Sequence, residues 1–191
     1  HGGLGDDMTA AEFWERPGIA PGLRAAGLEV IAPDRDTSPE SWTTAAANVG
    51  RAMTQPCSVV AGSNGVSVAL RLAIDSPSLV ERLVLTWPAT AGDGRVDALA
   101  PPHVRQLLTG QTVRGVTDDD LATISVPTWI VASDPPNPFH AQETAERLGA
   151  LLPDATLLPN GFPESPRPDF PDRCVEFVDT IVPLLRDGIS R

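Results

Sequence analysis

The sequence predicts an α/β fold with a mostly parallel sheet flanked by helices on both faces. Short apolar runs rich in Val, Ile and Leu recur along the chain and have the length of buried strands. Segments with apolar residues at helical spacing lie between most of these runs. Such alternation is typical of parallel strands, because each parallel connection needs a crossover. No internal repeat or linker interrupts the 191 residues, so 1–191 is interpreted as a single domain.

The amino-terminal third carries signals for two helices and one strand. A helix is expected over 9–24, because Thr9 followed by Glu12 is the pattern of a capping box, and a proline inside it predicts a break or kink. The apolar run 28–34 contains a proline near its end and predicts a short strand. Apolar residues at helical spacing predict the next helix over 41–54.

The rest of the chain continues the alternation. These strands are predicted from short runs that contain Val, Ile or Leu, and the helices from apolar residues at helical spacing. In chain order we expect a strand at 58–60, a helix from 68 to about 75, strands at 80–86 and 126–132, a helix at 142–152, a strand at 155–158 and a helix at 171–185. Residues 91–125 break the pattern, because they are polar and rich in Asp and Pro.

Charge and cysteine content exclude several classes of function. The chain has 14 Lys and Arg against 25 Asp and Glu, a net charge of −11, which argues against a nucleic-acid partner. Cys57 and Cys174 stand in no metal-ligand spacing, so we expect no metal, no cofactor and a reducing, cytoplasmic location. No apolar run reaches the roughly 18 residues of a membrane span, and no signal peptide is visible, so no membrane partner is expected.

The most informative stretch surrounds Ser63. A β-branched run leads into it, an apolar helical stretch leads out, and small residues flank it at Ala61, Gly62 and Gly65. This arrangement resembles the nucleophile elbow of the α/β-hydrolase family, with Ala61 in place of the usual glycine. The competing interpretation is an ordinary strand-to-helix loop with small residues, which any βαβ unit can contain.

The resemblance extends to other parts of the chain. His1-Gly2-Gly3 is similar to the family loop that follows the third strand, which implies that three amino-terminal strands are absent from this sequence; the alternative is an unstructured start or a tag remnant. The segment 91–125 stands where the family inserts a cap or lid, and it is short enough to hold two helical segments at most.

The resemblance also implies site residues. Ser63 is the expected nucleophile, with the backbone N–H groups of Asn64 and Gly3 as donors to the oxyanion. Asp134 follows a predicted strand at the family's position for the acid that orients the histidine. An ordinary turn aspartate before prolines is the competing interpretation of Asp134.

The histidine is where the chain departs from the family. The loop at 158–169, where the family carries it, contains none. Of the three histidines, His1 belongs to the glycine-rich loop and His103 to the lid segment, so His140 is the first candidate for the base. Glu164, close to the vacant position, is the second, and the Ser-His-Asp triad is expected to be incomplete.

Two function classes remain from the sequence. The first is a hydrolase of a small ester, amide or related carbonyl substrate, with Trp87 and Glu164 lining the pocket. The second is a catalytically impaired or non-hydrolytic member of the fold that binds a small ligand. A buried core tryptophan is an equally good interpretation of Trp87. A small molecule is the expected partner in either case, and the sequence does not determine the oligomeric state.

Overall fold

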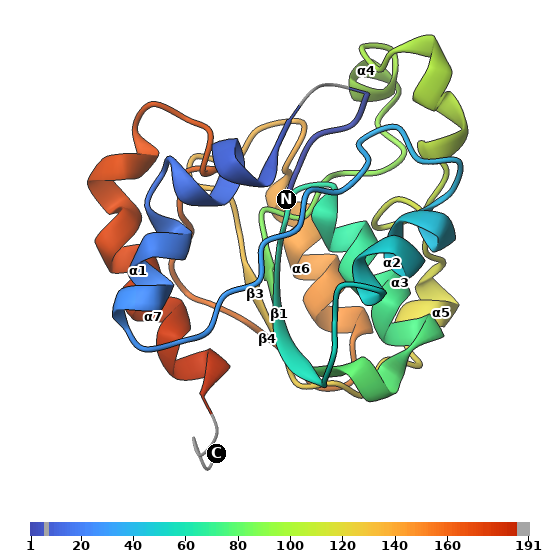
Figure 1. Ribbon diagram of the computed structural model, residues 1–191. Coiled ribbons are helices and arrows are strands. Elements are labelled where there is room, and N and C mark those ends of the chain that lie inside the picture. Colours follow the sequence, from blue (N-terminus) through green and yellow to red (C-terminus); the bar gives the residue numbers. More distant parts are fainter. Residues whose placement is uncertain (6–7, 187–191) are drawn as a thin grey trace.

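The computed structural model describes residues 1–5 and 8–186, and its centre is a four-stranded parallel sheet in the order β1-β2-β3-β4 (Figure 1). The strands are β1 (Cys57–Gly62), β2 (Val80–Thr86), β3 (Thr128–Val131) and β4 (Ala155–Leu157). Gly62 is in register with Thr86, and Thr86 with Val131, so the carboxyl ends of three strands meet at one edge. The predicted α/β class is confirmed, and Ser63 follows β1 directly at this edge.

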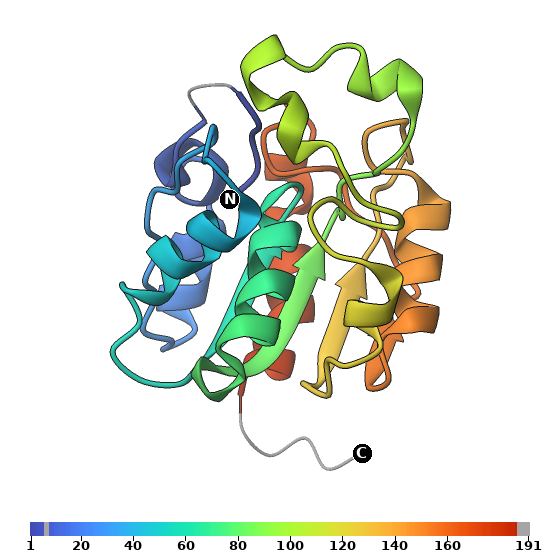
Figure 2. The same ribbon diagram turned by 90° about the vertical axis from the view of Figure 1, so that its right-hand side faces the viewer.

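Helices cover both faces of the sheet, as predicted (Figures 1 and 2). The α-helices are α1 (Ile19–Ala25), α2 (Trp42–Gly50), α3 (Gly65–Asp75), α4 (Gly94–Asp97), α5 (Asp118–Leu121), α6 (Gln142–Leu151) and α7 (Cys174–Leu185). A π-helix (Ala11–Glu15) and 3-10 helices at Pro77–Leu79, Pro102–Leu107 and Phe170–Arg173 complete the described elements. Within the described residues, no helix is long and apolar enough to cross a membrane.

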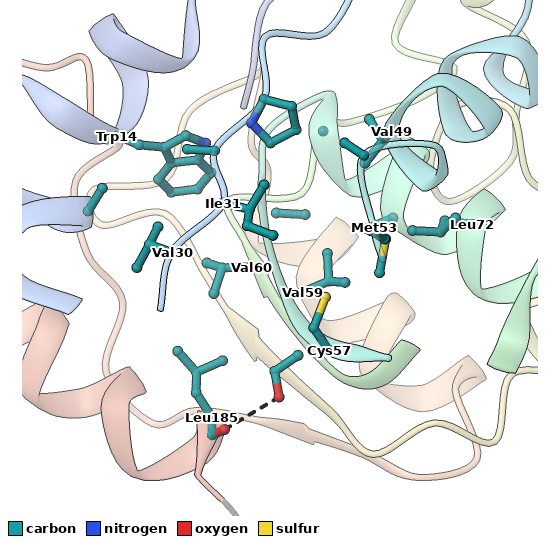
Figure 3. A pocket seen from close by; sticks show the side chains of 18 of the residues that line it. Trp14, Val30, Ile31, Val49, Met53, Cys57, Val59, Val60, Leu72 and Leu185 are labelled. Carbon is teal, nitrogen blue, oxygen red and sulfur yellow. Dashed lines mark hydrogen bonds between the residues drawn. The ribbon is translucent and has the colours of Figure 1, made fainter. Parts of the chain in front are cut away.

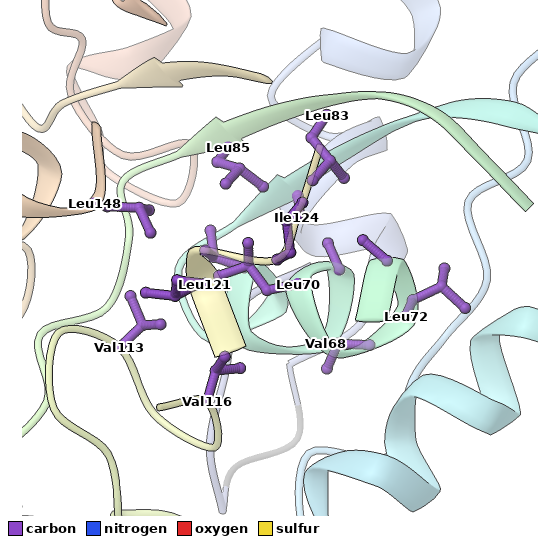
Figure 4. Close-up of a cluster of buried hydrophobic side chains, with 14 of the residues drawn as sticks. Val68, Leu70, Leu72, Leu83, Leu85, Val113, Val116, Leu121, Ile124 and Leu148 are labelled. Carbon is purple, nitrogen blue, oxygen red and sulfur yellow. The ribbon is translucent and has the colours of Figure 1, made fainter. Parts of the chain in front are cut away.

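Alternate residues of β2 enter two separate cores. Leu83 and Leu85 point to the face covered by α2, α3 and α6, where Figure 4 shows them packed against α3 residues such as Leu70. Val84 points to the opposite face and joins the cluster formed with α1 and α7. The second half of β2, from Leu83 to Thr86, is therefore buried on both sides, whereas Glu81 near its start is exposed.

The helix predicted over 9–24 is divided in two. The capping box is present, since the Thr9 N–H donates to the Glu12 carboxylate at 3.0 Å and the Glu12 N–H to the Thr9 hydroxyl at 3.2 Å. The first segment ends before Gly18, whose φ of 95° no helix interior adopts, and α1 starts immediately after it. Pro17 marks the predicted break.

The strand predicted at 28–34 is wrong. These residues join no sheet, because a cavity of about 380 Å³ separates them from β1 (Figure 3). Residues 28–33 form one wall, Cys57–Ala61 of β1 the other, and Trp14 and Leu185 also line the space. Paired strands lie ~4.8 Å apart, so a segment held across such a cavity has no ladder to enter.

Residues 91–125 lie between β2 and β3 and contain α4, α5 and the 3-10 helix at Pro102–Leu107. Figure 2 shows the first part of this segment, with α4 and the 3-10 helix, over the carboxyl end of the sheet. Val104, Leu107 and Val113 are buried in the same core as α3, which attaches the segment to the body of the domain.

Candidate active site

The turn at Ser63 is built by close backbone packing. Ser63 has φ of 54°, a left-handed conformation that is unusual for a residue other than glycine. A Cβ atom on Gly62 would lie 2.6 Å from the Phe13 ring, and one on Gly65 would lie 2.6 Å from the His1 carbonyl oxygen. Ala61 is tolerated because it is a strand residue of β1, where a methyl group fits. The small residues around Ser63 are therefore required by sterics.

His140 lies beside the Ser63 hydroxyl. Its Nε2 is 3.0 Å from Ser63 Oγ, and its Nδ1 is 2.9 Å from Glu164 Oε1. An ionised carboxylate only accepts hydrogen bonds, so the Nδ1 proton is assigned to the Glu164 contact and Nε2 is left as acceptor for the serine proton. The three side chains form one continuous hydrogen-bonded relay.

Glu164 is held as a carboxylate by its donors. Burial by itself raises the pKa of Glu164, but hydrogen bonds from His140 and Ser133 outweigh this effect and lower the pKa to about 2. Ser133 Oγ donates to Glu164 Oε1 at 2.6 Å, and the Asn137 side-chain amide donates to the same oxygen at 2.5 Å. A carboxylate that stays ionised at neutral pH is suited to orienting an imidazole.

Backbone pairing beyond the strands brings Glu164 to this place. The Phe162 N–H donates to the Ala132 carbonyl at 3.1 Å, and the Asp134 N–H donates to the Phe162 carbonyl at 3.0 Å. The loops after β3 and β4 thus continue the parallel pairing past the sheet, with Ser133 opposite Phe162. Two residues later Glu164 faces the loop that carries His140.

The expected acid, Asp134, does not contact His140. Asp134 is exposed at the carboxyl edge of the sheet, as its position after β3 predicted, but Glu164 occupies the Nδ1 side of the imidazole. The assignment of Asp134 as the orienting acid is corrected for this reason. The expectation of an incomplete relay is corrected as well, because the histidine reaches the serine from the loop after β3 and the acid from the loop after β4.

The glycine-rich start packs against the Ser63 turn. A Cβ on Gly2 would lie 3.0 Å from Ser63 Cβ, and Gly3 has φ of 91°. The buried Arg35 fixes this loop, since its guanidinium donates to the carbonyls of His1 and Gly2 at 2.8 and 2.9 Å and also to that of Gly3. The loop is therefore held directly against the Ser63 turn.

Two other histidines have different surroundings. His1 is buried, and its Nε2 accepts the backbone N–H of Arg35 at 2.9 Å. The ring therefore helps to hold the glycine-rich loop against Arg35. His103 is exposed in the segment 91–125, with its Nε2 3.3 Å from Ser38 Oγ. His140 is the histidine whose ring lies 3.0 Å from the Ser63 hydroxyl.

Asn64 and the segment 91–125 are joined by a buried cation. The Arg114 guanidinium donates to the Asn64 side-chain oxygen at 2.9 Å and pairs with Asp97 at 3.2 Å. Burial lowers the pKa of Arg114, and the Asp97 charge opposes that shift. Asn64 itself lies at the amino end of α3, where backbone N–H groups and the helix dipole favour negative charge.

Trp87 belongs to the core and is not a pocket wall. Its side chain is fully buried, and its Nε1–H donates to the Phe162 carbonyl at 2.8 Å. The ring stacks on Phe177 with centroids 5.4 Å apart and meets Phe170 edge-on at 5.8 Å. The pocket assignment of Trp87 is corrected, and the core interpretation holds.

Sequence reasoning missed Ser133, Asn137 and Arg35. Asn137 stands between two prolines, which marks a turn but not a contact with a residue 27 positions away. The described residues contain no group of three or more His, Cys, Asp or Glu side chains that could hold a metal ion.

Comparisons with known proteins gave structural neighbours only. A scan against protein-family models and a search of curated proteins produced no match. The meta-cleavage product hydrolase CumD from Pseudomonas fluorescens IP01 is 20% identical, with a TM-score of 0.69 over 95% of this chain and 87% of that protein.

Two further neighbours have similar scores. An esterase from Exiguobacterium antarcticum is 18% identical, with a TM-score of 0.72 over 97% of this chain and 89% of that one. A serine hydrolase from Cycloclasticus zankles is 16% identical, with a TM-score of 0.66 over 95% of this chain and 87% of that one. At these identities the likeness concerns the fold.

Proposed function

Because this chain has the α/β-hydrolase fold, we propose that it is a serine hydrolase with Ser63 as nucleophile, His140 as general base and Glu164 as the orienting acid. The observation that carries the proposal is the relay from Ser63 Oγ through His140 to Glu164, with contacts of 3.0 and 2.9 Å. A serine hydroxyl is a weak nucleophile by itself, and such a relay supplies the base that it needs.

The reaction follows from the positions of these atoms. His140 Nε2 takes the Ser63 Oγ proton while Oγ bonds to the substrate carbonyl carbon, and the carbonyl oxygen becomes an oxyanion. The backbone N–H groups of Asn64 and Gly3 are the proposed donors to that oxyanion. The imidazolium then protonates the leaving group, and a water molecule activated by His140 releases the acyl group from Ser63.

The substrate is proposed to be a small ester, amide or related carbonyl compound. The segment 91–125 is proposed to act as a short lid, since it lies over the carboxyl edge of the sheet and Arg114 contacts Asn64 beside the nucleophile. The chemistry needs no cofactor, and the free thiols Cys57 and Cys174 agree with the cytoplasmic location proposed for the protein.

The alternative of a non-hydrolytic, ligand-binding protein rested on a missing base. The contact between His140 and Ser63 supplies that base, so hydrolysis is the better supported function.

The direct test combines a fluorophosphonate probe, which labels activated serines, with hydrolysis of p-nitrophenyl acetate. We expect Ser63→Ala and His140→Ala to lower kcat by about 10³-fold or more, and Glu164→Gln by about 10²-fold or more. Labelling should disappear in Ser63→Ala and become slow in the other two variants.

The matched controls are His103→Ala and Asp134→Asn, which alter an exposed histidine and an exposed acid. Both should label and turn over like the wild type. Rapid labelling of Ser63 in His140→Ala would disprove the assignment of the base.

A further inference from the structure

We propose that Asn137 is a positioning residue that holds His140 and Glu164 in one fixed arrangement, a role that rests on the proposed serine-hydrolase function. Its side-chain amide nitrogen donates to Glu164 Oε1 at 2.5 Å. Its side-chain oxygen accepts the backbone N–H of Phe139 at 3.0 Å and that of His140 at 3.2 Å. One amide group thus contacts both the acid and the backbone that carries the histidine.

The loop around Asn137 depends on these contacts. The His140 N–H also lies 3.0 Å from the Asn137 carbonyl, which closes a tight turn between the two residues. Thr90 holds the far side of the turn, because its N–H donates to the Phe139 carbonyl at 2.8 Å and its hydroxyl accepts the Ala141 N–H at 3.0 Å. On the side of the turn that faces Glu164, the Asn137 side chain holds the backbone of Phe139 and His140, and it thereby sets the position of the imidazole relative to Glu164.

Only an amide has the donor and acceptor that this place requires. An aspartate at 137 keeps an acceptor for the two backbone N–H groups but loses the donor, and it puts a second carboxylate beside Glu164. An alanine loses both functions. Asn137→Ala therefore tests the loss of both hydrogen-bonding functions, and Asn137→Asp tests the loss of the donor together with an added negative charge.

Ser133 provides the comparison, because its hydroxyl contacts Glu164 but not the backbone of the turn from Asn137 to His140. Its hydroxyl donates to Glu164 Oε1 at 2.6 Å and also lies 3.0 Å from the Pro135 carbonyl. Ser133→Ala removes one donor from the carboxylate and leaves the turn at His140 intact. If Asn137 acted only through Glu164, the two alanine variants would behave alike.

The experiment measures kcat, KM and the pH profile of p-nitrophenyl acetate hydrolysis for the wild type, Asn137→Ala, Asn137→Asp and Ser133→Ala. We expect Asn137→Ala to lower kcat by about 10- to 100-fold with little change in KM, because small displacements of a catalytic group reduce rates on this scale. Ser133→Ala should lower kcat less. Asn48→Ala, which alters an exposed asparagine on α2, should match the wild type.

Asn137→Asp provides a second readout that simple loss of packing would not change. A carboxylate close to the His140–Glu164 pair favours the imidazolium, so the acid limb of the kcat/KM profile should move to higher pH. If Asn137→Ala does not fold, the kcat and the pH profile of Asn137→Asp still test the proposal. Wild-type kcat and an unchanged acid limb in the variants would overturn the proposal, as would equal effects of Asn137→Ala and Ser133→Ala.

A proton NMR measurement separates this proposal from the proposed function. The Nδ1 proton of His140, hydrogen-bonded to Glu164, should give a downfield resonance that His140→Ala removes and that Asn137→Ala shifts or broadens. If the wild type hydrolyses nothing but this resonance depends on Asn137, the function fails and the positioning role stands. If hydrolysis depends on His140 but the resonance is indifferent to Asn137, the positioning role fails.

Discussion

His140 Nε2 lies 3.0 Å from Ser63 Oγ, although the two residues are 77 positions apart in the chain. The imidazole comes from the loop after β3, and its carboxylate partner comes from the loop after β4. Along the chain the relay therefore runs serine, histidine, glutamate. The resemblance to the hydrolase family implies an acid in the loop after β3 and a histidine in the loop after β4, whereas here the imidazole comes from the first loop and the contacting carboxylate from the second.

The low pKa of Glu164 predicts a pH dependence of stability. Its folded-state pKa of about 2 lies below the ordinary value of 4.5, so ionised Glu164 stabilises the fold above pH ~4.5, and this contribution is lost as the pH falls toward 2. The shift corresponds to at most about 3 kcal/mol. Urea unfolding of the wild type and Glu164→Gln should show a free-energy difference at pH 6 that narrows at pH 3. A difference that does not vary with pH would contradict the assignment.

The left-handed backbone of Ser63 predicts a gain in stability when the serine is replaced by glycine. Glycine adopts φ near 54° without the steric cost that a Cβ atom brings, whereas alanine keeps that cost. Ser63→Gly should therefore be more stable than Ser63→Ala by about 1 kcal/mol in urea unfolding. Equal unfolding free energies for the two inactive variants would show that the turn carries no such strain.

Because Trp87 is buried in the core, we expect its substitution to lower the stability of the fold but to leave the reactivity of Ser63 unchanged. Trp87→Phe removes the indole donor and leaves the Phe162 carbonyl without that hydrogen bond, which should lower the unfolding free energy by about 1–3 kcal/mol. At a temperature where the variant is folded, fluorophosphonate labelling of Ser63 should proceed at the wild-type rate. Altered substrate preference in this variant would instead favour a place for Trp87 in the pocket.

The cavity beside β1 predicts different reactivity for the two cysteines. Cys57 lines this cavity and is half-buried, whereas Cys174 is buried against the α1 side of the fold. Burial raises the pKa of both thiols, so both should react slowly at neutral pH. Mass spectrometry after maleimide treatment should find Cys57 modified several-fold faster. Preferential modification of Cys174 would mean that the cavity is closed in solution.

The sequence by itself determined the fold class and the place of Ser63 in the turn between a strand and a helix. Both depend on local patterns: apolar runs of strand length alternating with helical spacing, and small residues around Ser63 where a strand and a helix nearly touch. The failure at residues 28–34 has a physical cause. A strand-like sequence becomes a strand only when another strand lies within hydrogen-bonding distance, and a cavity intervenes here.

Only the tertiary structure decided which residues complete the relay. Asp134 and Glu164 are both acids after predicted strands, and nothing local distinguishes them. The choice depends on the turn at Asn137, which brings His140 back over Ser63, and on pairing between Ser133 and Phe162, which carries Glu164 to the imidazole. The turn is local, but the pairing of Ser133 with Phe162 and the contact of Asn137 with Glu164 join residues more than 20 positions apart, and they form when the loops after β3 and β4 pack together.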